Sequence, residues 1–195
     1  MTRKIILLLI AAAGTLASTA TAGPVYHFQE AGDIGPTFTF NQDGFDLTLS
    51  AFLTTGGTTH LFVVNAAGTT ADPSNQNEIA TNAFIQLTLP TTPASHLDFV
   101  TITDIGPGES ANVFFNTTPG TLNGAQLIGT LTANGNVPVG PAFQNGFIDV
   151  TAGAGNVLLF GAQFSPVSAP DAGSTSSLLG MGLVGLAALR RKLRV

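Results

Sequence analysis

The sequence has no cysteine, no tryptophan and a single tyrosine. Without cysteine the chain has no disulfide, no thiolate nucleophile and no Cys-ligated zinc site. Without tryptophan, a surface for stacking on sugar rings has few side chains to draw on. Charged residues make up only 9% of the 195 residues, against about 25% in ordinary soluble domains.

Basic residues are missing from the whole interior of the chain. All Lys and Arg residues lie within residues 1–4 or 190–195, whereas all 11 acidic residues lie between Glu30 and Asp171. Nucleic-acid binding depends on Lys and Arg contacts with phosphate, and phosphate-binding enzymes usually need such contacts as well. We therefore expect no nucleic-acid partner and no nucleotide chemistry.

Residues 1–22 have the three parts of a secretory signal peptide. Two basic residues precede the apolar run of residues 5–13, and small residues follow it up to an A-x-A pattern. A buried N-terminal helix or a retained anchor is the alternative. The predicted signal peptidase site comprises Ala20, Ala22 and Gly23.

The C-terminal end has a second apolar segment, residues 174–189, which carries no charge. It is shorter than the roughly 17–25 residues of an ordinary spanning helix, but it has no polar stripe of the kind a surface helix shows. We expect a short transmembrane helix, with a core helix or a plain anchor as alternatives. The basic residues that would hold its end in the cytoplasm, so that the preceding domain lies outside, are Arg190, Arg191, Lys192 and Arg194.

A short polar motif lies at the start of this tail. Its residues are Pro170, Asp171, Ala172, Gly173, Ser174 and Thr175. With the apolar run and the basic end, this motif makes residues 169–195 similar to a PEP-CTERM sorting signal, closest to the VPDSG-CTERM form. Ala169 stands where that form usually has Val, and Ala172 where it has Ser.

The resemblance implies a partner and a route. An exosortase, a membrane-embedded cysteine protease-transpeptidase, would recognise the tail of the inserted precursor and remove it near the motif. The protein would then be released or attached at the surface of a Gram-negative cell that makes exopolysaccharide. The resemblance is limited to the tail and transfers no activity to the preceding domain.

Residues 23–168 read as one all-β domain between the signal peptide (1–22) and the tail (169–195). Apolar and polar residues alternate in residues 45–51 and 85–89, as in half-buried strands. Gly, Pro, Asn and Asp separate the candidate strands, which favours a β-sandwich or jelly roll with a phenylalanine core. We expect residues 165–169 to be a linker. Further candidate strands are residues 37–41, 61–65, 97–103, 112–116, 126–131, 146–151 and 156–164.

Two loops have the oxygen-bearing side chains that calcium prefers, residues 41–46 and 72–78. The alternative is that Asn and Asp occur there because they favour turns. The second loop is the better candidate for calcium. Its ligands would be Asp72, Asn75, Asn77 and Glu78.

Catalytic residues form no motif in this sequence. His27, His60 and His96 are far apart and have no zinc-ligand spacing, and there is no G-x-S-x-G elbow. Carboxylates for glycoside hydrolysis are present, but nothing selects a pair among them. We expect no enzyme activity and no cofactor other than the candidate calcium.

The sequence leaves three functional hypotheses. The first is a non-catalytic, exported surface or extracellular-matrix protein associated with exopolysaccharide in a biofilm. The second is a carbohydrate-binding jelly-roll module with structural calcium, which a groove lined with aromatic rings would favour. The third is a secreted hydrolase, which a cleft with two converging carboxylates would favour.

Overall fold

The computed structural model describes residues 23–29, 32–42, 45–89 and 95–166. Within these ranges the chain forms β-strands and no helix, which confirms the all-β prediction. The strands are β1 (Val25–His27), β2 (Gly32–Gly35), β3 (Thr37–Gln42), β4 (Phe45–Leu53), β5 (Leu61–Val63), β6 (Ala67–Thr69), β7 (Ile79–Ala80), β8 (Ala83–Thr88), β9 (Ser95–Thr103), β10 (Ser110–Asn116), β11 (Gln126–Leu131), β12 (Gly135–Pro138), β13 (Phe147–Ala154) and β14 (Asn156–Pro166).

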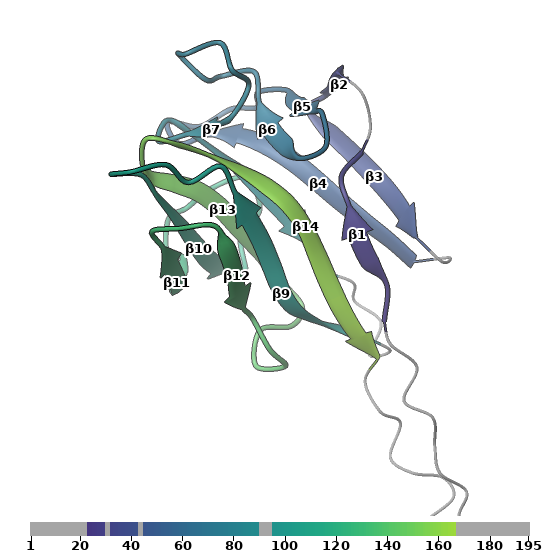
Figure 1. Cartoon of the computed structure of the whole chain (residues 1–195). Coiled ribbons are helices and arrows are strands. Elements are labelled where there is room, and N and C mark those ends of the chain that lie inside the picture. Colours follow the sequence, from purple (N-terminus) through teal and green to yellow (C-terminus); the bar gives the residue numbers. More distant parts are fainter. Residues whose placement is uncertain (1–22, 30–31, 43–44, 90–94, 167–195) are drawn as a thin grey trace, which may run out of the picture. The chain divides into compact units, whose positions relative to one another are not determined.

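The strands form two antiparallel sheets, one of eight strands and one of six. The order in the eight-stranded sheet is β12-β9-β14-β6-β5-β2, and β1 and β7 also pair with β14. The order in the six-stranded sheet is β11-β10-β13-β8-β4-β3. Figure 1 shows the eight-stranded sheet in front, with β14 and β9 at its centre, and the six-stranded sheet behind it.

One hydrophobic core lies between the two sheets, so the fold is a β-sandwich. Leu49 of β4 and Ile85 of β8 lie in the same buried cluster as Val100 of β9 and Leu159 of β14, and all four side chains are fully buried. Full burial of one such side chain is worth about 1.5–3 kcal/mol. The core follows from the period-two alternation that the sequence shows in β4 and β8. A jelly-roll connectivity within this class stays a prediction.

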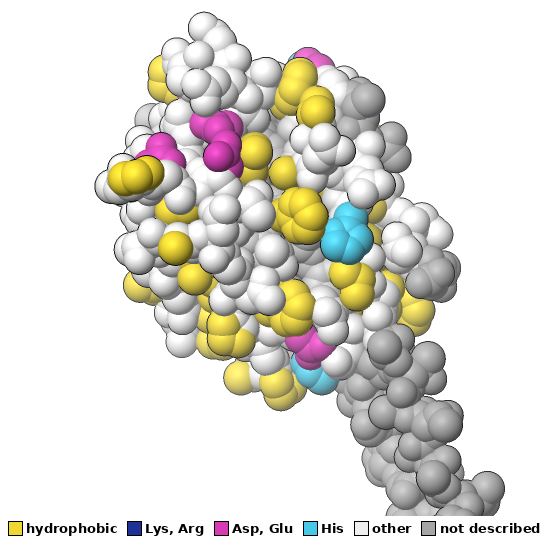
Figure 2. Space-filling model, viewed as in Figure 1, with side chains coloured by type: hydrophobic (Ala, Val, Ile, Leu, Met, Phe, Trp, Pro, Cys, Tyr) yellow, Lys and Arg dark blue, Asp and Glu magenta, His cyan; other side chains and the backbone are white. Residues whose placement is uncertain are grey.

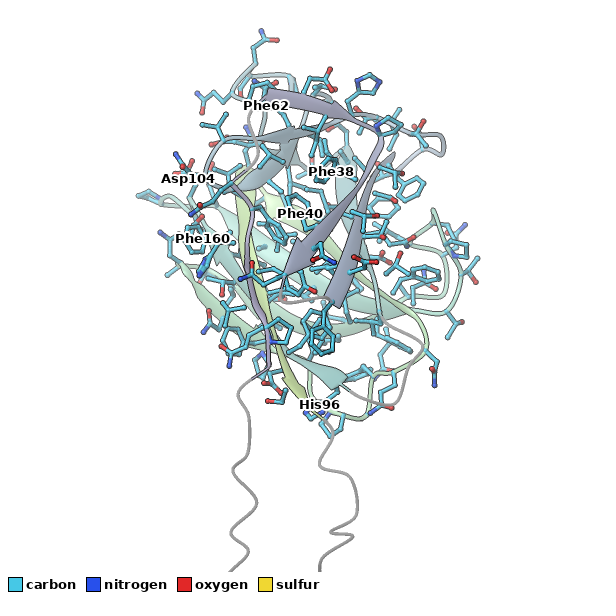
Figure 3. The ribbon with its side chains drawn as sticks, turned by 90° about the vertical axis from the view of Figure 1, so that its right-hand side faces the viewer. Phe38, Phe40, Phe62, His96, Asp104 and Phe160 are labelled. Atoms are coloured by element: carbon cyan, nitrogen blue, oxygen red, sulfur yellow. The ribbon has the colours of Figure 1, made fainter. Side chains whose placement is uncertain are left out.

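Phenylalanine contributes less to this core than the sequence suggested. Only four of the 14 phenylalanines are buried, while Phe45 is 41% exposed. Leu, Ile, Val and Ala fill most of the space between the sheets. Phe38 of β3 is only partly buried and packs against the core, with its ring centroid 4.9 Å from that of the buried Phe40 (Figure 3). The buried phenylalanines are Phe28, Phe40, Phe84 and Phe164.

All the strand candidates overlap observed strands, and the main difference lies at the C-terminal boundary. The linker was predicted to start at Ser165, but β14 continues to Pro166, because both residues still pair with β9. That prediction was wrong because Pro at a strand end needs no N–H in the ladder.

The predicted signal peptide and sorting tail lie outside the described residues. Among the described residues, none belongs to a helix with the length and apolarity that membrane crossing requires. The transmembrane helix expected within residues 169–195 stays a prediction.

Candidate functional site

The start of the described chain lies directly on the last strand. The Phe164 N–H donates to the Pro24 carbonyl oxygen at 3.1 Å. A Cβ atom on Gly23 would lie 2.0 Å from the Phe164 carbonyl oxygen, so only glycine fits. A chain that begins at Gly23, as the predicted peptidase site implies, would thus keep every residue that the sandwich uses. Ala20, Ala22, residues 170–175 and the basic end lie outside the described residues.

The loop of residues 70–78 is organised around the carboxylate of Asp72, which is only 4% exposed. Its Oδ1 accepts hydrogen bonds from the Ser74 N–H (2.8 Å) and the Asn156 side-chain amide (3.2 Å). Its Oδ2 accepts from the Ser74 hydroxyl (2.6 Å) and from the N–H groups of Gln76 (3.0 Å) and Glu78 (3.3 Å). Both oxygens of the first candidate calcium ligand therefore already bind donors of the protein.

These hydrogen bonds decide the charge of Asp72. Burial acts to raise the pKa of this carboxyl, but the hydrogen bonds from Ser74, Glu78 and Gln76 together lower it below its usual value. A carboxylate that accepts several N–H bonds is stabilised in its charged form. Asp72 is thus an ionised anchor for its own loop.

The two asparagines of the predicted calcium loop shape its backbone. Asn75 and Asn77 have φ angles of 59° and 61°, in the left-handed region that Asn tolerates better than most residues. The Asn75 N–H donates to the Asp72 carbonyl oxygen at 3.2 Å. Asn75 and Asn77 therefore have the turn-forming role that the sequence offered as the alternative to calcium binding. Among the described residues, no group of three or more His, Asp or Glu has the arrangement of a metal site.

The structure adds two residues that the sequence did not select, Asp104 and Asn156. The side chain of Glu78, 7% exposed, lies near Asp104 and Asn156, both of which affect its pKa. Burial, the hydrogen bond to Asp104 and the charges of Asp104 and Asp72 raise the pKa of Glu78 to about 7. A proton or a cation at Glu78 would reduce its repulsion with the neighbouring acidic side chains.

The other candidate calcium loop, residues 41–46, closes the hairpin between β3 and β4. The Asn41 side-chain amide donates to Asp46 Oδ1 at 2.6 Å, and both side chains are exposed. Residues 43–44 lie outside the described residues. The visible part of this loop pairs across the strand ends, as turn residues do.

The three histidines have separate partners. His27 on β1 contacts the Phe160 ring edge-on at 5.4 Å. His60 lies 2.9 Å from Asp33 Oδ2, and His96 Nε2 lies 3.1 Å from Asp98 Oδ1. Figure 3 shows His96 at the opposite end of the sandwich from Asp104. Because each histidine has a different partner, the structure gives no sign of a shared histidine site.

The carboxylates proposed for hydrolysis are also used locally. Glu109 accepts the Gly106 N–H at 2.7 Å and the Asn156 N–H at 3.3 Å. Asp104 lies close enough to Glu78 to raise the pKa of Glu78, so the structure does bring these two carboxyls together. Figure 2 shows one face of the eight-stranded sheet, with scattered hydrophobic and acidic side chains and no Lys or Arg.

A buried carboxyl on the six-stranded sheet was missed by sequence reasoning. Asp149 of β13 is fully buried, and its Oδ1 accepts a 2.7 Å hydrogen bond from the Gln86 side-chain amide of β8. Burial raises the pKa of Asp149 to about 7, although hydrogen bonds from Gln86 and Asn116 act to lower it. Its partner is 63 residues away in sequence, so no local pattern signals the site.

Comparison with known proteins identifies the tail. Residues 170–193 match the family model of the VPDSG-CTERM motif. This confirms the resemblance seen in the sequence: these residues are a PEP-CTERM-like sorting tail. The motif indicates an exported protein that is sorted through its C-terminal end. No curated protein and no solved structure matches the chain.

Proposed function

We propose that the chain is a non-catalytic protein of the cell surface or extracellular matrix, associated with exopolysaccharide and processed at its tail by an exosortase-like enzyme. The match at residues 170–193 carries this proposal. The signal peptide expected in residues 1–22 would start export, and the tail would hold the precursor in the membrane until cleavage. The sandwich is the part that would remain outside.

The charge distribution of the chain supports this division. All basic residues lie in the two terminal segments that processing would remove, so the mature sandwich would carry only acidic charges. Such a domain does not adhere to anionic nucleic acid or phosphate groups. The association with polysaccharide rests on the kind of tail and on no contact in the sandwich.

The carboxylates of the described domain support a non-catalytic role. Asp72 and Glu109 each bind backbone N–H groups of neighbouring loops. A carboxylate that binds several backbone N–H groups has a fixed position, which suits a structural anchor. A secreted hydrolase stays the third proposal, and it would need two carboxylates that converge at a cleft.

The sorting proposal is tested in a host that carries the matching exosortase. The double substitution Pro170→Ala and Asp171→Ala alters the motif, while Ser176→Ala and Ser177→Ala in the same tail serve as the matched control. We expect mass spectrometry to find the tail removed in the wild type and in the control, and retained in the motif variant. Equal processing of all three chains would contradict recognition through the motif.

The second proposal is a carbohydrate-binding module with structural calcium. The exposed His27 ring packed on Phe160 offers a small ring surface, and the carboxyl pair of Glu78 and Asp104 offers oxygens for a cation. We expect the double substitution His27→Ala and Phe160→Ala to abolish retention on a neutral polysaccharide gel, with Leu127→Ala, 53% exposed on β11, as the control. If the gel did not retain the wild-type protein, the proposal of a carbohydrate-binding module would be contradicted.

A further inference from the structure

Asp149 lies on the outward-facing side of the six-stranded sheet, where a charged residue would ordinarily meet solvent. Its neighbours on β13, Ile148 and Val150, face the core. In the strand register, Asp149 is flanked by Phe114 of β10 and Gln86 of β8. Asp149 is nonetheless fully buried and Gln86 is 2% exposed. The carboxyl of Asp149 therefore points away from the core and is still shielded from water.

The loop of residues 117–125 lies over this position and is bound to it through two amide side chains. Gln86 donates to Asp149 Oδ1 at 2.7 Å and accepts the Gly120 N–H at 3.1 Å, so it links the carboxyl to the loop. Asn116 accepts the Thr118 N–H at 3.0 Å and donates to the Thr121 carbonyl oxygen at 2.5 Å. A Cβ atom on Gly120 would lie 3.2 Å from the Phe52 ring, which shows how closely the loop approaches the sheet.

The described residues include no Lys or Arg that could compensate a negative charge on Asp149, and the side-chain amides of Gln86 and Asn116 are what act to stabilise it. Its Oδ2 atom is buried and has no hydrogen-bond partner among the described residues. The neighbours on β8, β10 and β13 are neutral, and residues 117–125 contain no ionisable side chain. Among the described residues of this face, the other acidic side chain is that of Asp46 of β4, which is exposed and bonded to Asn41. A buried carboxylate without a counter-charge is destabilising, so the closed loop favours the neutral acid.

We propose that Asp149 is a pH-sensitive anchor of the loop of residues 117–125: the neutral carboxyl keeps the loop closed over the six-stranded sheet, and loss of its proton to water favours the open loop. Opening would let water solvate the carboxylate and would expose the outer face around Gln86 and Phe84. The proposal is independent of the sorting tail. It concerns a domain that, once exported, meets the pH of the surroundings.

The linkage has a defined direction and range. In the closed state burial raises the pKa of Asp149 to about 7, while a solvated aspartate has a pKa of about 3.9. Between these values the open state has lost a proton that the closed state keeps. The opening equilibrium should therefore rise up to about tenfold per pH unit from about pH 4 to pH 7 and level off above it.

Hydrogen exchange of the full-length chain in mild detergent, from pH 4.5 to 8.5, tests the proposal. The N–H groups of Thr118 and Gly120 report on the closed loop, after correction for the intrinsic exchange rate. We expect their protection to fall with the stated slope in the wild type and to be independent of pH in Asp149→Asn. Asp46→Asn, an exposed acid on the same face, is the control and should keep the wild-type slope.

A second measurement needs no substitution. The 13C shift of the Asp149 carboxyl in the wild type should titrate near pH 7. Titration near the ordinary value for aspartate would overturn the proposal. So would loop protection that does not change with pH in the wild type, or a slope that persists in Asp149→Asn.

Discussion

Asp72 and Asp149 are two buried carboxyls of one sandwich, and their pKa values move in opposite directions. Asp72 accepts hydrogen bonds from its own loop and from Asn156, and its pKa is lowered. Asp149 has one oxygen without a partner, and its pKa is raised to about 7. Asp149 lies deeper in the protein and accepts fewer hydrogen bonds than Asp72, and both differences favour its neutral form. The loop of residues 70–78 therefore needs an anion, and the loop of residues 117–125 needs a neutral acid.

The largest expected effect that tests this difference between Asp72 and Asp149 is the pH dependence of the free energy of unfolding. The raised pKa of Asp149 contributes stability that is fully present below about pH 4 and is lost as the pH rises to 7. We expect Asp149→Asn to gain on the wild type by up to about 1.4 kcal/mol per pH unit over this range. Urea unfolding at several pH values measures the difference. A difference that is constant from pH 4.5 to 7 would contradict the assignment.

The next effect is the loss of the Asp72 anchor. Asp72→Ala leaves the N–H groups of Ser74, Gln76 and Glu78 without their acceptor, and we expect it to cost about 2–4 kcal/mol at pH 7. Because the pKa of Asp72 is lowered, its contribution is present above about pH 4 and is lost as the pH falls further. Asp46→Ala, at an exposed position, is the control for chemical denaturation and should change stability by less than about 0.5 kcal/mol. Equal losses in the two variants would show that Asp72 anchors nothing.

Removal of one donor from each site sharpens the contrast. Gln86→Leu removes the only protein donor to Asp149 Oδ1 among the described hydrogen bonds and the acceptor for the Gly120 N–H. We expect it to cost about 2 kcal/mol. Ser74→Ala removes one hydroxyl donor from Asp72, which keeps its backbone donors, so we expect a loss of about 0.5–1 kcal/mol. Thermal unfolding of both variants gives the comparison, and a larger loss in Ser74→Ala would reverse it.

The smallest effect concerns a cation at the carboxyl pair of Glu78 and Asp104. Calcium would compete with the proton of Glu78, whose pKa is raised to about 7, so it should bind better at pH 8 than at pH 5.5. At ten times its Kd calcium would stabilise the fold by about 1.4 kcal/mol. The thermal midpoint with calcium, with magnesium and in the variant Glu78→Gln measures this. If calcium left the thermal midpoint unchanged at pH 8, the proposed binding of calcium at Glu78 and Asp104 would be contradicted.

Local periodicity was enough to predict the long strands of the sandwich. In β4 and β8 the alternation identifies both the strand and the side that faces the core. The short strands β1, β2, β6, β7 and β12 were not predicted, because two to four residues show no period. β6 reads Ala-Gly-Thr and is a strand only through pairing with β5 and β14.

The candidate sites were less predictable because they depend on distant segments. The loop around Asp72 was selected from its composition, and its hydrogen bonds to residues 74–78 are local. Asp104 and Asn156 reach the same site only through the ends of β9 and β14. At Asp149 the alternation of β13 predicts an exposed carboxylate, but the residue is buried, and the loop of residues 117–125 is bound to its partner Gln86. The tail was recognisable because its three parts stand in fixed order along the chain.

The intact mass of the protein recovered from the envelope and the medium of its producing cell tests the central claim most directly. We predict a mass that lacks residues 1–22 and everything after about Pro170, which would establish export and removal of the sorting tail. A mass that retains the tail would contradict the sorting proposal and leave a plain membrane anchor or a core helix as the role of residues 174–189.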